Sequence, residues 1–561
     1  MTRLIECVPN ISEGRDESVY RAVAAVVETV EGVALLDVDP GKATHRTVIT
    51  FAGPPEAVVE AAVRLARKTV DLIDMRGHHG EHPRFGALDV CPLVPVSGVT
   101  MEETAVYARE LAKRLGEEVG LTVFCYENAA PRPERKNLAD VRQGEYEGLA
   151  ERLADPDWKP DFGPAEFNPR SGATAVGARD FLVAYNVNLN TTSTRRANAI
   201  AFDIRERGRP QRTGDPVTGP IVKDAQGREV WIPGSLKATK AIGWFIEEYG
   251  IAQISINLTN ISITPIHVAF DEVCRKAQER GLRVTGSEIV GLVPLRALLD
   301  AGRHYLAQQE RSLGVSDREL IKIAVKSLGL DDLTPFDPHK KVIEYVLAAR
   351  EKRRRLVDLS VQGFIEETAS ESPAPGGGSV AATVGALGAA LGTMVANLSS
   401  HRRGWDERWR EFSDWAEQGK TAHAELARLV DEDTDAFNAL MAAFGLPKGS
   451  ASEKAARDSA IQEATRRAIE VPLRVMEVAL RSMDVIEAMA RTGMESSVSD
   501  AGVGALCARA AVRGAGLNVR INVRGLSDGA LRASFLERAE ELEERAEYHE
   551  RTILAAVEHR L

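Results

Sequence analysis

Hydrophobic positions in the first third of the chain alternate between short apolar runs and amphipathic stretches. Residues 17–30 carry valines three and four positions apart, and residues 55–73 begin with a proline, so both are predicted to be helices. Runs rich in β-branched and apolar residues predict strands at residues 3–8, 33–38, 47–51 and 88–96. After these elements, a further helix is predicted at residues 102–119 and a further strand at residues 121–126. The order strand-helix-strand-strand-helix-strand is the split pattern of a ferredoxin-like sandwich.

A second α+β unit is predicted after a passage rich in Pro, Gly and Asp at residues 155–172. Its strands are predicted at residues 181–189, 251–258 and 289–294, and its helices at residues 197–207, 236–248 and 266–280. Residues 208–234, between the first two of these helices, form a long turn-rich insertion. Loops of that length are usually functional or disordered.

From about Ser316 to the C-terminus the pattern predicts only helices. Apolar residues recur at helical spacing in residues 317–328, 342–354, 356–369, 379–399, 406–445, 453–491, 501–514 and 527–561. Pro472 should kink or divide one of these helices, because proline lacks the N–H that a helix interior needs. This third is therefore predicted to be an all-α unit. The predicted connector to the rest of the chain is residues 329–341 with the basic run after them.

Length and charge narrow the class of protein. The 561 residues are too many for one hydrophobic core and predict about three compact units. The net charge of −11 argues against nucleic acid as a partner. The N-terminal sequence breaks at Pro9 after a few apolar residues, so no signal peptide is expected.

The cysteines are odd in number, dispersed and never in a Cys-x-x-Cys pair, which argues against a disulfide framework or a zinc site and fits a reducing cytoplasm. They are Cys7, Cys91, Cys125, Cys274 and Cys507.

Residues 379–400 carry no charge and are long enough to span a membrane. They are mostly Ala, Gly, Ser and Thr, which gain little in lipid, and they have no aromatic belt. Gly385, Gly388 and Gly392 fall along one side of a helix, where they permit close helix contact. A buried or interface helix is therefore expected rather than a membrane span.

The sequence RGHHGEHPR, residues 76–84, places several imidazoles on one glycine-containing loop. Histidine gives and takes protons near neutral pH, so acid–base chemistry is one interpretation. His78 and His82 also have the spacing of a metal-binding pair, although Gly80 and Pro83 weaken the helix that such a pair normally needs. Structural or solvent-exposed histidines are the third alternative.

Two glycine-containing segments are candidate binding sites. Residues 163–177, GPAEFNPRSGATAVG, offer a stacking face at Phe167 and donors at Asn168 and Arg170. A flat heteroaromatic ligand with an acidic tail suits such a loop, and a plain interdomain linker explains it equally well. Residues 374–379, APGGGS, open the uncharged helix, where free backbone N–H groups attract anions. No Gly-Lys-Ser/Thr follows, so this is not a P-loop, and a simple helix start is the alternative.

In LARLVDEDTDAFNALM, residues 426–441, the apolar stripe of a helix has one gap, at Asp433. Asp433 is therefore predicted to face inward, with Asp431, Glu432 and Asp435 mainly outside the stripe. A carboxyl on an apolar face loses solvation, so its pKa should rise towards a useful acid–base range. A structural ion pair is the alternative, with Arg466, Arg467 and Arg509 as candidate partners.

Three polar residues near the C-terminus complete the candidates. Ser499 is predicted to cap the helix that follows it. Asn518 and Asn522 either face a cleft or belong to a turn and a short extended segment.

Several long motifs occur along the whole chain, in the order ECVPNISEGR, GEHPRFGALDVCPLVPV, DFGPAEFNPRSGATAVGARDF, AQISINLTN, GSEIVGLVPLRALLDA, APGGGSVAA and LVDEDTDAF. With these motifs the sequence strongly resembles the formiminotransferase-cyclodeaminase family, bifunctional folate enzymes of histidine breakdown. The chief departure is the insertion at residues 208–234, which resembles that of bacterial transferases and is shorter in animal enzymes.

The resemblance implies a fold and two activities. The fold is an α+β N-terminal half of two ferredoxin-like sheet-helix subdomains, residues 1–178 and 179–328, a linker at residues 329–355, and an all-α helical cyclodeaminase domain at residues 356–561. The activities are transfer of a formimino group between 5-formimidoyltetrahydrofolate and L-glutamate, and cyclisation of that folate to 5,10-methenyltetrahydrofolate with release of ammonia.

The resemblance also implies roles for residues. The histidine of the GEHPR motif, here His82, is the family's proton donor in the transferase, and the middle acid of the LVDxD motif, here Asp433, is its cyclodeaminase residue. Asp39 or His45 is a candidate base or orienter in the transferase. The family's folate-binding stretch matches Gly163, Pro164, Ala165, Glu166, Phe167, Asn168, Pro169, Arg170, Ser171 and Gly172. Weaker candidates at the start of the uncharged helix are Gly376, Gly377, Gly378 and Ser379.

Folate and L-glutamate are the expected small-molecule substrates, with tetrahydrofolate in its polyglutamate form as co-substrate. No metal or prosthetic group is expected, since nothing changes oxidation state. A cytoplasmic homo-oligomer built from dimers is expected, with no nucleic-acid or membrane partner. The alternative keeps the fold and changes the donor: a glutamate formyltransferase whose helical third is a non-catalytic dimerisation domain.

Overall fold

The computed structural model describes residues 3–41, 45–79, 84–214, 219–247, 249–350 and 355–561. The chain divides into two compact units. The first holds Met1–Ala301 with Val325–Glu351, and the second holds Gly302–Ala324 with Lys352–Leu561. The first unit contains the sheets of both predicted α+β subdomains, and the second is helical. Residues 302–324 of the second predicted subdomain belong to the helical unit, and most of the predicted linker belongs to the first unit.

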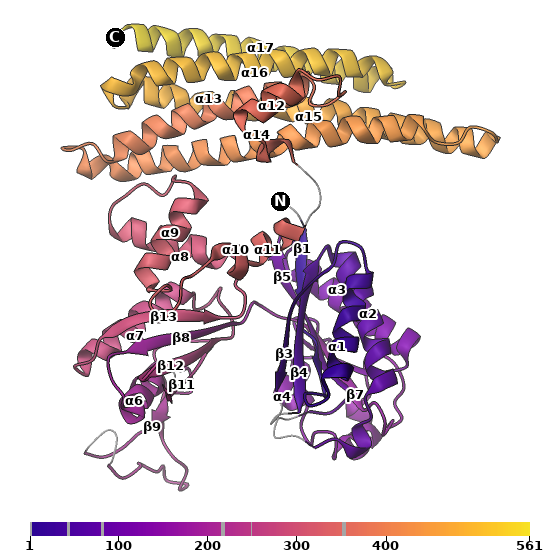
Figure 1. The fold of residues 1–561 in the computed structure, drawn as a ribbon, viewed down its shortest axis with the longest axis vertical. Helices are drawn as coiled ribbons and strands as arrows, with labels where there is room; N and C mark the ends of the chain where they lie inside the picture. Colours follow the sequence, from indigo (N-terminus) through magenta and orange to yellow (C-terminus); the bar gives the residue numbers. More distant parts are fainter. Residues whose placement is uncertain (1–2, 42–44, 80–83, 215–218, 248, 351–354) are drawn as a thin grey trace. The chain divides into compact units, whose positions relative to one another are not determined.

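The N-terminal sheet has the predicted ferredoxin-like order. Its antiparallel strands are, from the edge, β3 (Ala34–Gly41), β4 (Arg46–Gly53), β1 (Leu4–Cys7) and β5 (Leu88–Ser97). Helices α1 (Glu17–Ala25), α2 (Pro55–Leu72) and α3 (Met101–Arg114) cover one face (Figure 1). Strand β2 (Asn10–Ile11) also pairs with β4 and β5, and parallel strands β7 (Ala173–Ala178) and β6 (Thr122–Glu127) extend the sheet.

The two faces of this sheet differ in chemistry. Ile5 and Cys7 of β1 are fully buried in the core beneath the helices. Because side chains alternate along a strand, Glu6 between them points to the opposite face. Asp37 and Asp39 of β3 line the same cavity as Glu6 on this open face. The open face therefore carries carboxyl groups where the covered face is apolar.

The second sheet repeats the same order of elements. Strands β8 (Val183–Leu189), β11 (Thr239–Ile246), β12 (Ile251–Leu258) and β13 (Val284–Val290) form the order β11-β12-β8-β13. Helices α6 (Thr194–Ile204) and α7 (Ile266–Glu279) connect them. Strand-helix-strand-strand-helix-strand thus occurs twice, which confirms the predicted fold class of two ferredoxin-like subdomains.

Strand β11 corrects the sequence prediction, which made residues 236–248 a helix. The strand pairs with β12 along its whole length, from Thr239 opposite Leu258 to Ile246 opposite Ile251. A contact distant in sequence favours the strand: the side-chain amide of Asn198 on α6 donates to the Gly243 carbonyl and accepts from the Gly243 N–H. The strand predicted at residues 289–294 also begins earlier, at Val284, and ends at Val290.

The insertion at residues 208–234 has secondary structure of its own. Short strands β9 (Arg209–Pro210) and β10 (Trp231–Ile232) pair at its base. Bridges between Arg212 and Ile221 and between Lys223 and Glu229 continue the pairing. The described part of the insertion is therefore a hairpin-like arm.

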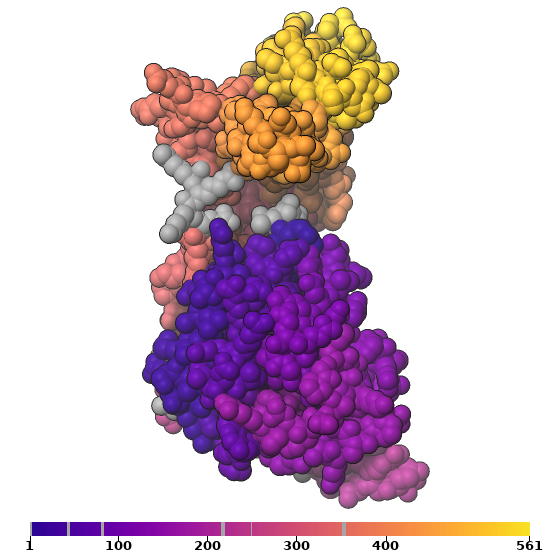
Figure 2. Space-filling model, turned by 90° about the vertical axis from the view of Figure 1, so that its right-hand side faces the viewer, coloured from indigo at the N-terminus to yellow at the C-terminus, as the bar shows by residue number. Residues whose placement is uncertain are grey.

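The helical unit is built from long helices: α13 (Gly377–Ser400), α14 (Trp409–Phe444), α15 (Ala451–Thr492), α16 (Val498–Asn522) and α17 (Gly529–Glu558). Helix α13 packs against α14, α15 and α16, whereas α17 (yellow) lies along α15 and α16 at the outer edge of the unit (Figures 1 and 2). Helix α12 (Val361–Thr368) also belongs to this unit, and α8 (Leu295–Gln308) and α9 (Asp317–Leu328) belong partly to it. Helices α4 (Leu138–Val141), α5 (Leu149–Ala154), α10 (Pro338–Lys341) and α11 (Ile343–Arg350) belong to the first unit.

Helix α13 is the one helix of the described residues that is long and apolar enough to cross a membrane, and more than half of its most apolar window is buried. Its glycines permit close packing: a Cβ at Gly388 would lie 2.8 Å from the carbonyl oxygen of Gly504 on α16, and one at Gly392 would lie 2.9 Å from Ile486 on α15. The helix thus packs within the helical unit on one side, while Leu387 on it is exposed, which fits the expectation of a buried or interface helix.

Pro472 does not divide α15, which runs from Ala451 to Thr492, so division is excluded and a kink stays a prediction. One local prediction in this unit is wrong. Ser499 does not cap α16, because the chain enters this helix through a 3₁₀ turn at Glu495–Ser497 and Ser499 lies inside the first helical turn.

Candidate active sites

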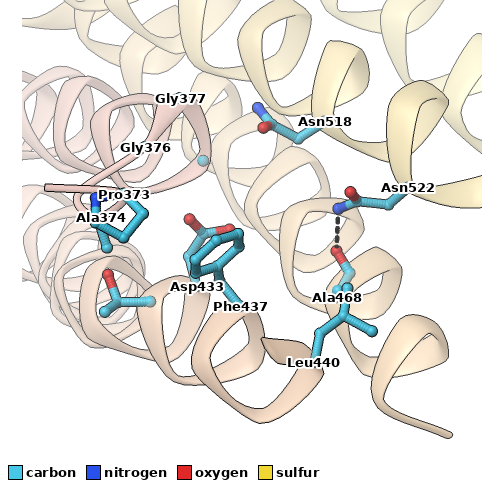
Figure 3. A pocket seen from close by; sticks show the side chains of 12 residues that line it. Pro373, Ala374, Gly376, Gly377, Asp433, Phe437, Leu440, Ala468, Asn518 and Asn522 are labelled. Atoms are coloured by element: carbon cyan, nitrogen blue, oxygen red, sulfur yellow. Dashed lines mark hydrogen bonds between the residues drawn. The ribbon is translucent and has the colours of Figure 1, made fainter. Parts of the chain in front are cut away.

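A cavity of about 240 Å³ opens at the N-terminal end of α13. Its walls come from the turn before α13 and from helices α14, α15 and α16. Asp433 and Phe437 of α14 line it opposite Asn518 and Asn522 of α16, with Ala468 of α15 between them (Figure 3). Asn518 and Asn522 therefore face a cleft, as one of the two interpretations predicted, and α16 is helical through both of them.

Asp433 faces inward as the gap in the apolar stripe predicted. Burial raises the pKa of its carboxyl group, and hydrogen bonds from the hydroxyl and backbone N–H of Ser379 oppose part of this rise. No ion pair to Asp433 is found in the part of the chain that the structure describes. Arg466 instead pairs with Glu463, and Arg509 pairs with Glu547. The ion-pair alternative is therefore not supported.

The Ser379 hydroxyl gives Asp433 a partner in either protonation state. Ser379 Oγ lies 3.2 Å from Asp433 Oδ2, 2.9 Å from the carbonyl oxygen of Val430 and 3.3 Å from Thr434 Oγ1. An ionised Asp433 can accept the single hydroxyl proton. A neutral Asp433 can instead donate to Ser379 Oγ, while Ser379 donates to Val430. The arrangement suits a carboxyl group that both takes and gives a proton.

The glycine run at the start of α13 makes room for polar side chains of the cavity. Gly376 is the N-cap, and Gly377 and Gly378 lie in the first turn. A Cβ on Gly378 would lie 2.1 Å from Asp433 Oδ1, and a Cβ on Gly377 would lie 3.3 Å from Asn518 Nδ2. The Asp433 carboxyl group also accepts a hydrogen bond from the backbone N–H of Ser379 in this first turn.

We expect Gly378→Ala to lower the rate of the reaction at this cavity about 100-fold, because the added methyl must displace the Asp433 carboxyl group and small displacements of a reacting group are costly. Gly502→Ala on α16 is the matched control, since its Cβ would meet only an ordinary contact at 3.4 Å. Turnover and thermal unfolding of both variants check this. Normal turnover by Gly378→Ala would show that the position of Asp433 is unimportant.

Pro472 explains the orientation of Asn522. Proline has no N–H, so the carbonyl group of Ala468, four residues earlier in α15, loses its usual helical donor. The side-chain amide of Asn522 donates to this carbonyl oxygen instead, at 2.8 Å (Figure 3). The proline predicted to break the helix therefore leaves a free acceptor at the cavity wall, and this acceptor holds Asn522 in place.

The second candidate site lies around the histidine loop of the first unit. His82 is outside the described residues, as are Gly80, Glu81 and Pro83, so its predicted role stays a prediction. The neighbouring His78 is buried, and burial lowers the pKa of its ring. Its Nε2–H donates to the carbonyl oxygen of His45 at 2.8 Å, and its Nδ1 accepts from Arg84 Nε at 3.3 Å. Both ring nitrogens are used, which argues against a metal pair of His78 with His82 and favours a structural role for His78.

His45 is a second fixed ring. It stacks on His78 with ring centroids 4.3 Å apart, and its backbone has the rarely populated φ of 49°. Its Nε2 lies 3.1 Å from Glu13 Oε1, and its Nδ1 lies 3.0 Å from the carbonyl oxygen of His79. Both ring nitrogens are therefore directed at groups of the protein. The arrangement favours an orienting role for His45 over that of a base.

The predicted folate-binding stretch, Gly163–Gly172, lies beside the end of the histidine loop. Gly172 has a φ of 62°, and a Cβ there would lie 2.2 Å from the carbonyl oxygen of Phe85. Phe167 is half-buried against the ring of Tyr146, at 5.6 Å between centroids, while most other residues of the stretch are exposed. An exposed aromatic-containing loop that begins and ends in glycines fits the interpretation as a ligand loop.

Tyr146 and Glu147 join this loop to the histidine loop, and sequence reasoning missed both. The Tyr146 hydroxyl donates to the Pro169 carbonyl, and the Tyr146 N–H donates to the Arg84 carbonyl at 3.0 Å. Glu147 accepts from the Arg84 guanidinium at 2.7 and 2.8 Å. Nothing in the local pattern marks these residues, because their partners lie far away in sequence.

Asp39 lies elsewhere on the open face, where it lines a cavity of about 430 Å³ with Glu6 and Arg179. Within the described residues, no group of three or more His, Cys, Asp or Glu side chains is placed to hold a metal ion.

Family profiles match nearly the whole chain. The profile "Formiminotransferase domain, N-terminal subdomain" matches residues 4–179, "Formiminotransferase domain" matches residues 184–348, and "Formiminotransferase-cyclodeaminase" matches residues 360–541. A formimidoyltransferase-cyclodeaminase of Mus musculus is 42% identical over 560 residues, which is 100% of both chains. The chain belongs to the formiminotransferase-cyclodeaminase family.

Two relatives are shorter and match only part of this chain. A glutamate formimidoyltransferase of Streptococcus pyogenes is 39% identical over 310 residues, which cover 55% of this chain and 95% of the relative. A methenyltetrahydrofolate cyclohydrolase of Methylorubrum extorquens is 41% identical over 184 residues, which cover 33% of this chain and 87% of the relative. Shorter proteins thus exist that match only part of the chain.

Proposed function

We propose that the first unit transfers a formimino group between 5-formimidoyltetrahydrofolate and L-glutamate, and that the helical unit cyclises the same folate to 5,10-methenyltetrahydrofolate with release of ammonia. The observation that carries this proposal is the cavity at the start of α13. In it, burial raises the pKa of the Asp433 carboxyl group, and a hydroxyl serves both of its protonation states. A non-catalytic dimerisation domain has no use for such a cavity.

In the helical unit, nitrogen-ten of the folate attacks the formimino carbon on nitrogen-five and closes a five-membered ring. The ionised Asp433 takes the proton that nitrogen-ten releases and then gives it to the amino group, which leaves as ammonia. A carboxyl group with a raised pKa suits this exchange, because its two protonation states are closer in free energy than those of a solvated aspartate. Asn518 and Asn522 offer hydrogen bonds to the polar edge of the substrate.

In the first unit, the deprotonated amine of glutamate attacks the formimino carbon. His82 protonates nitrogen-five as it departs, and the stretch Gly163–Gly172 holds the folate. Tyr146 and Glu147 support this assignment, because they fix the described ends of the two loops against each other. Holding two substrates in line supplies much of the acceleration. Tetrahydrofolate with a polyglutamate tail is the proposed co-substrate, and no metal or prosthetic group takes part.

Mixing the purified protein with 5-formimidoyltetrahydrofolate tests the proposal. Ammonia should be released without glutamate, and N-formimidoylglutamate should form when glutamate is added. A protein that formed N-formylglutamate from a formyl folate and released no ammonia would instead be the formyltransferase alternative, since a formyl group carries no nitrogen to lose.

We also propose that the protein is a homo-oligomer built from dimers, because neighbouring helices α13 and α16 expose apolar side chains. Leu506 and Leu517 of α16 are 49% and 67% exposed, and Leu387 of α13 is 59% exposed. Leu506→Glu with Leu517→Glu should lower the molecular mass in light scattering by at least half, since burying charge in an interface is costly. Val106→Glu, a change at another exposed apolar residue, is the control. An unchanged mass would place the interface elsewhere.

The proposed compartment is the cytoplasm, and the proposed role is in histidine degradation and one-carbon metabolism. The cysteines support a reducing compartment: Cys7 and Cys91 are buried free thiols that form a hydrogen bond with each other, with their sulfur atoms 3.5 Å apart.

A further inference from the structure

A cavity of about 530 Å³ in the second α+β subdomain has no role in either proposed reaction. Arg205, Glu206 and Arg207, which follow α6 directly, line this cavity. Lys240 and Ala241 of β11 line it as well, and none of its lining residues belongs to the two candidate active sites. The chain continues from Arg207 into the insertion arm, so the cavity lies at the base of this arm.

The two arginines of this cavity have no carboxylate partner. Within the described residues, the Arg205 guanidinium makes one hydrogen bond, from Nε to the carbonyl oxygen of Gly208 at 2.8 Å. In the same part of the chain, no hydrogen bond or ion pair reaches the Arg207 guanidinium. The carboxylate of Glu206, between them in sequence, accepts from the N–H of Ala238 at 2.8 Å instead. Both guanidinium groups therefore keep most of their N–H donors free.

Aromatic rings support the two guanidinium groups. Cζ of Arg205 lies 4.0 Å from the centre of the Phe202 ring, and Cζ of Arg207 lies 4.3 Å from the centre of the Trp231 ring. A ring contact holds the guanidinium plane and leaves its N–H edge for other partners. Burial lowers the pKa of Arg205, and the charge of Arg207 lowers it further. The two cations therefore repel each other, and a bound anion would relieve this repulsion.

Strand β11 adds a backbone donor to the cavity. The carbonyl oxygen of Thr239 accepts from the N–H of Glu206 at 2.9 Å. Gly243 exchanges two hydrogen bonds with Asn198. Thr239 and Gly243 thus turn their backbone groups away from β12. Backbone groups of alternate residues in an antiparallel strand point the same way, so the N–H of Ala241 also points to this side. Backbone N–H and guanidinium groups are the donors that bind oxyanions.

We propose that this cavity is a binding site for an oxyanion with two or more negative charges, either a phosphate or a small di- or tricarboxylate. The site is additional to the two candidate active sites. The free N–H groups of Arg205 and Arg207 hold the charged oxygens, and the N–H of Ala241 holds a further oxygen. Arginine suits this task because its planar fork matches the geometry of both phosphate and carboxylate.

Calorimetric titration of the full-length protein with inorganic phosphate, and separately with citrate, tests this site. A salt concentration of about 0.15 M largely screens the attraction of scattered surface charges. We expect saturable binding of at least one of these anions, and binding at least about 10-fold weaker by Arg205→Gln with Arg207→Gln, because charged hydrogen bonds are lost. Arg205→Lys with Arg207→Lys keeps the charges without the fork and should retain part of the affinity.

Arg195→Gln with Arg196→Gln is the matched control, because it removes the same charge from the other end of α6, away from the cavity lining. This variant should bind the anion as the unchanged protein does, and thermal unfolding of all variants should be alike. Binding of phosphate alone or of citrate alone supports the site and identifies its preferred oxyanion. The proposal is overturned by absence of saturable binding to the unchanged protein, by equal binding to the Arg205→Gln, Arg207→Gln variant, or by equal weakening in the control.

Discussion

Replacing Asp433 by Asn is expected to slow cyclodeamination about 100- to 10,000-fold, the range typical for loss of an acid–base group, and to leave formimino transfer unchanged. The amide keeps the shape of the side chain and can still accept from the Ser379 hydroxyl, but it cannot carry the proton from nitrogen-ten to the leaving amino group. Ammonia release and N-formimidoylglutamate formation, measured on the same preparation, check the two halves of this expectation.

Glu432→Gln is the matched control for Asp433→Asn. Glu432 is the preceding residue of α14 and pairs with Arg428 on the helix surface. Its loss should have little effect, since exposed ion pairs contribute at most about 1 kcal/mol. Undiminished ammonia release by Asp433→Asn would support the scaffold alternative for the helical unit.

Replacing His82 by Asn is expected to have the opposite selectivity. Transfer to glutamate should fall about 100- to 10,000-fold, because the departing folate nitrogen loses its proton donor, while ammonia release in the absence of glutamate should stay normal. Initial rates of both reactions measure this difference.

His79→Asn is the control for His82→Asn, because the loop uses the backbone carbonyl of His79, which any side chain retains. A large loss of transfer with His79→Asn, together with normal transfer by His82→Asn, would move the proton donor to the neighbouring histidine. Loss of both reactions in His82→Asn would indicate unfolding rather than a missing proton donor.

The spacing of apolar residues within one helix or strand was enough to predict the features that depend on that helix or strand alone. The gap in the apolar stripe of α14 identified Asp433 because a helix repeats its faces every few residues. The order of strands and helices in the first subdomain followed from short apolar runs for the same reason. The family resemblance then gave this carboxyl group and His82 their expected roles.

The main errors involve partners that lie far apart in the sequence. Local patterns predict a helix at residues 236–248, where the structure has strand β11, because they do not include the two hydrogen bonds between Asn198 and Gly243. The glycines before Ser379 were interpreted as an anion site or a simple helix start. Their use, making room for the Asp433 carboxyl group, depends on a helix more than fifty residues later. Pro472 is predicted to kink or divide its helix; the helix is not divided, and the hydrogen bond that the proline leaves open goes to Asn522 of the next helix.

The two candidate sites differ in kind, since one is built from loops and the other is a small cavity. This difference has a physical basis. Transfer joins two separate substrates, so its site needs loops that bring them into line, and the structure ties the described parts of these loops together through Tyr146 and Arg84. Cyclisation occurs within one substrate, so a small cavity with one titrating carboxyl group is sufficient. We therefore expect the two reactions to depend on different residues.

A mixing experiment with the two single variants tests this separation most directly. His82→Asn and Asp433→Asn are each incubated with N-formimidoylglutamate and tetrahydrofolate, alone and together, and formation of 5,10-methenyltetrahydrofolate is followed. Each variant alone should form almost none, and the mixture should form it readily, because one protein makes the formimidoyl folate and the other cyclises it. A mixture no more active than the separate variants would contradict two independent sites.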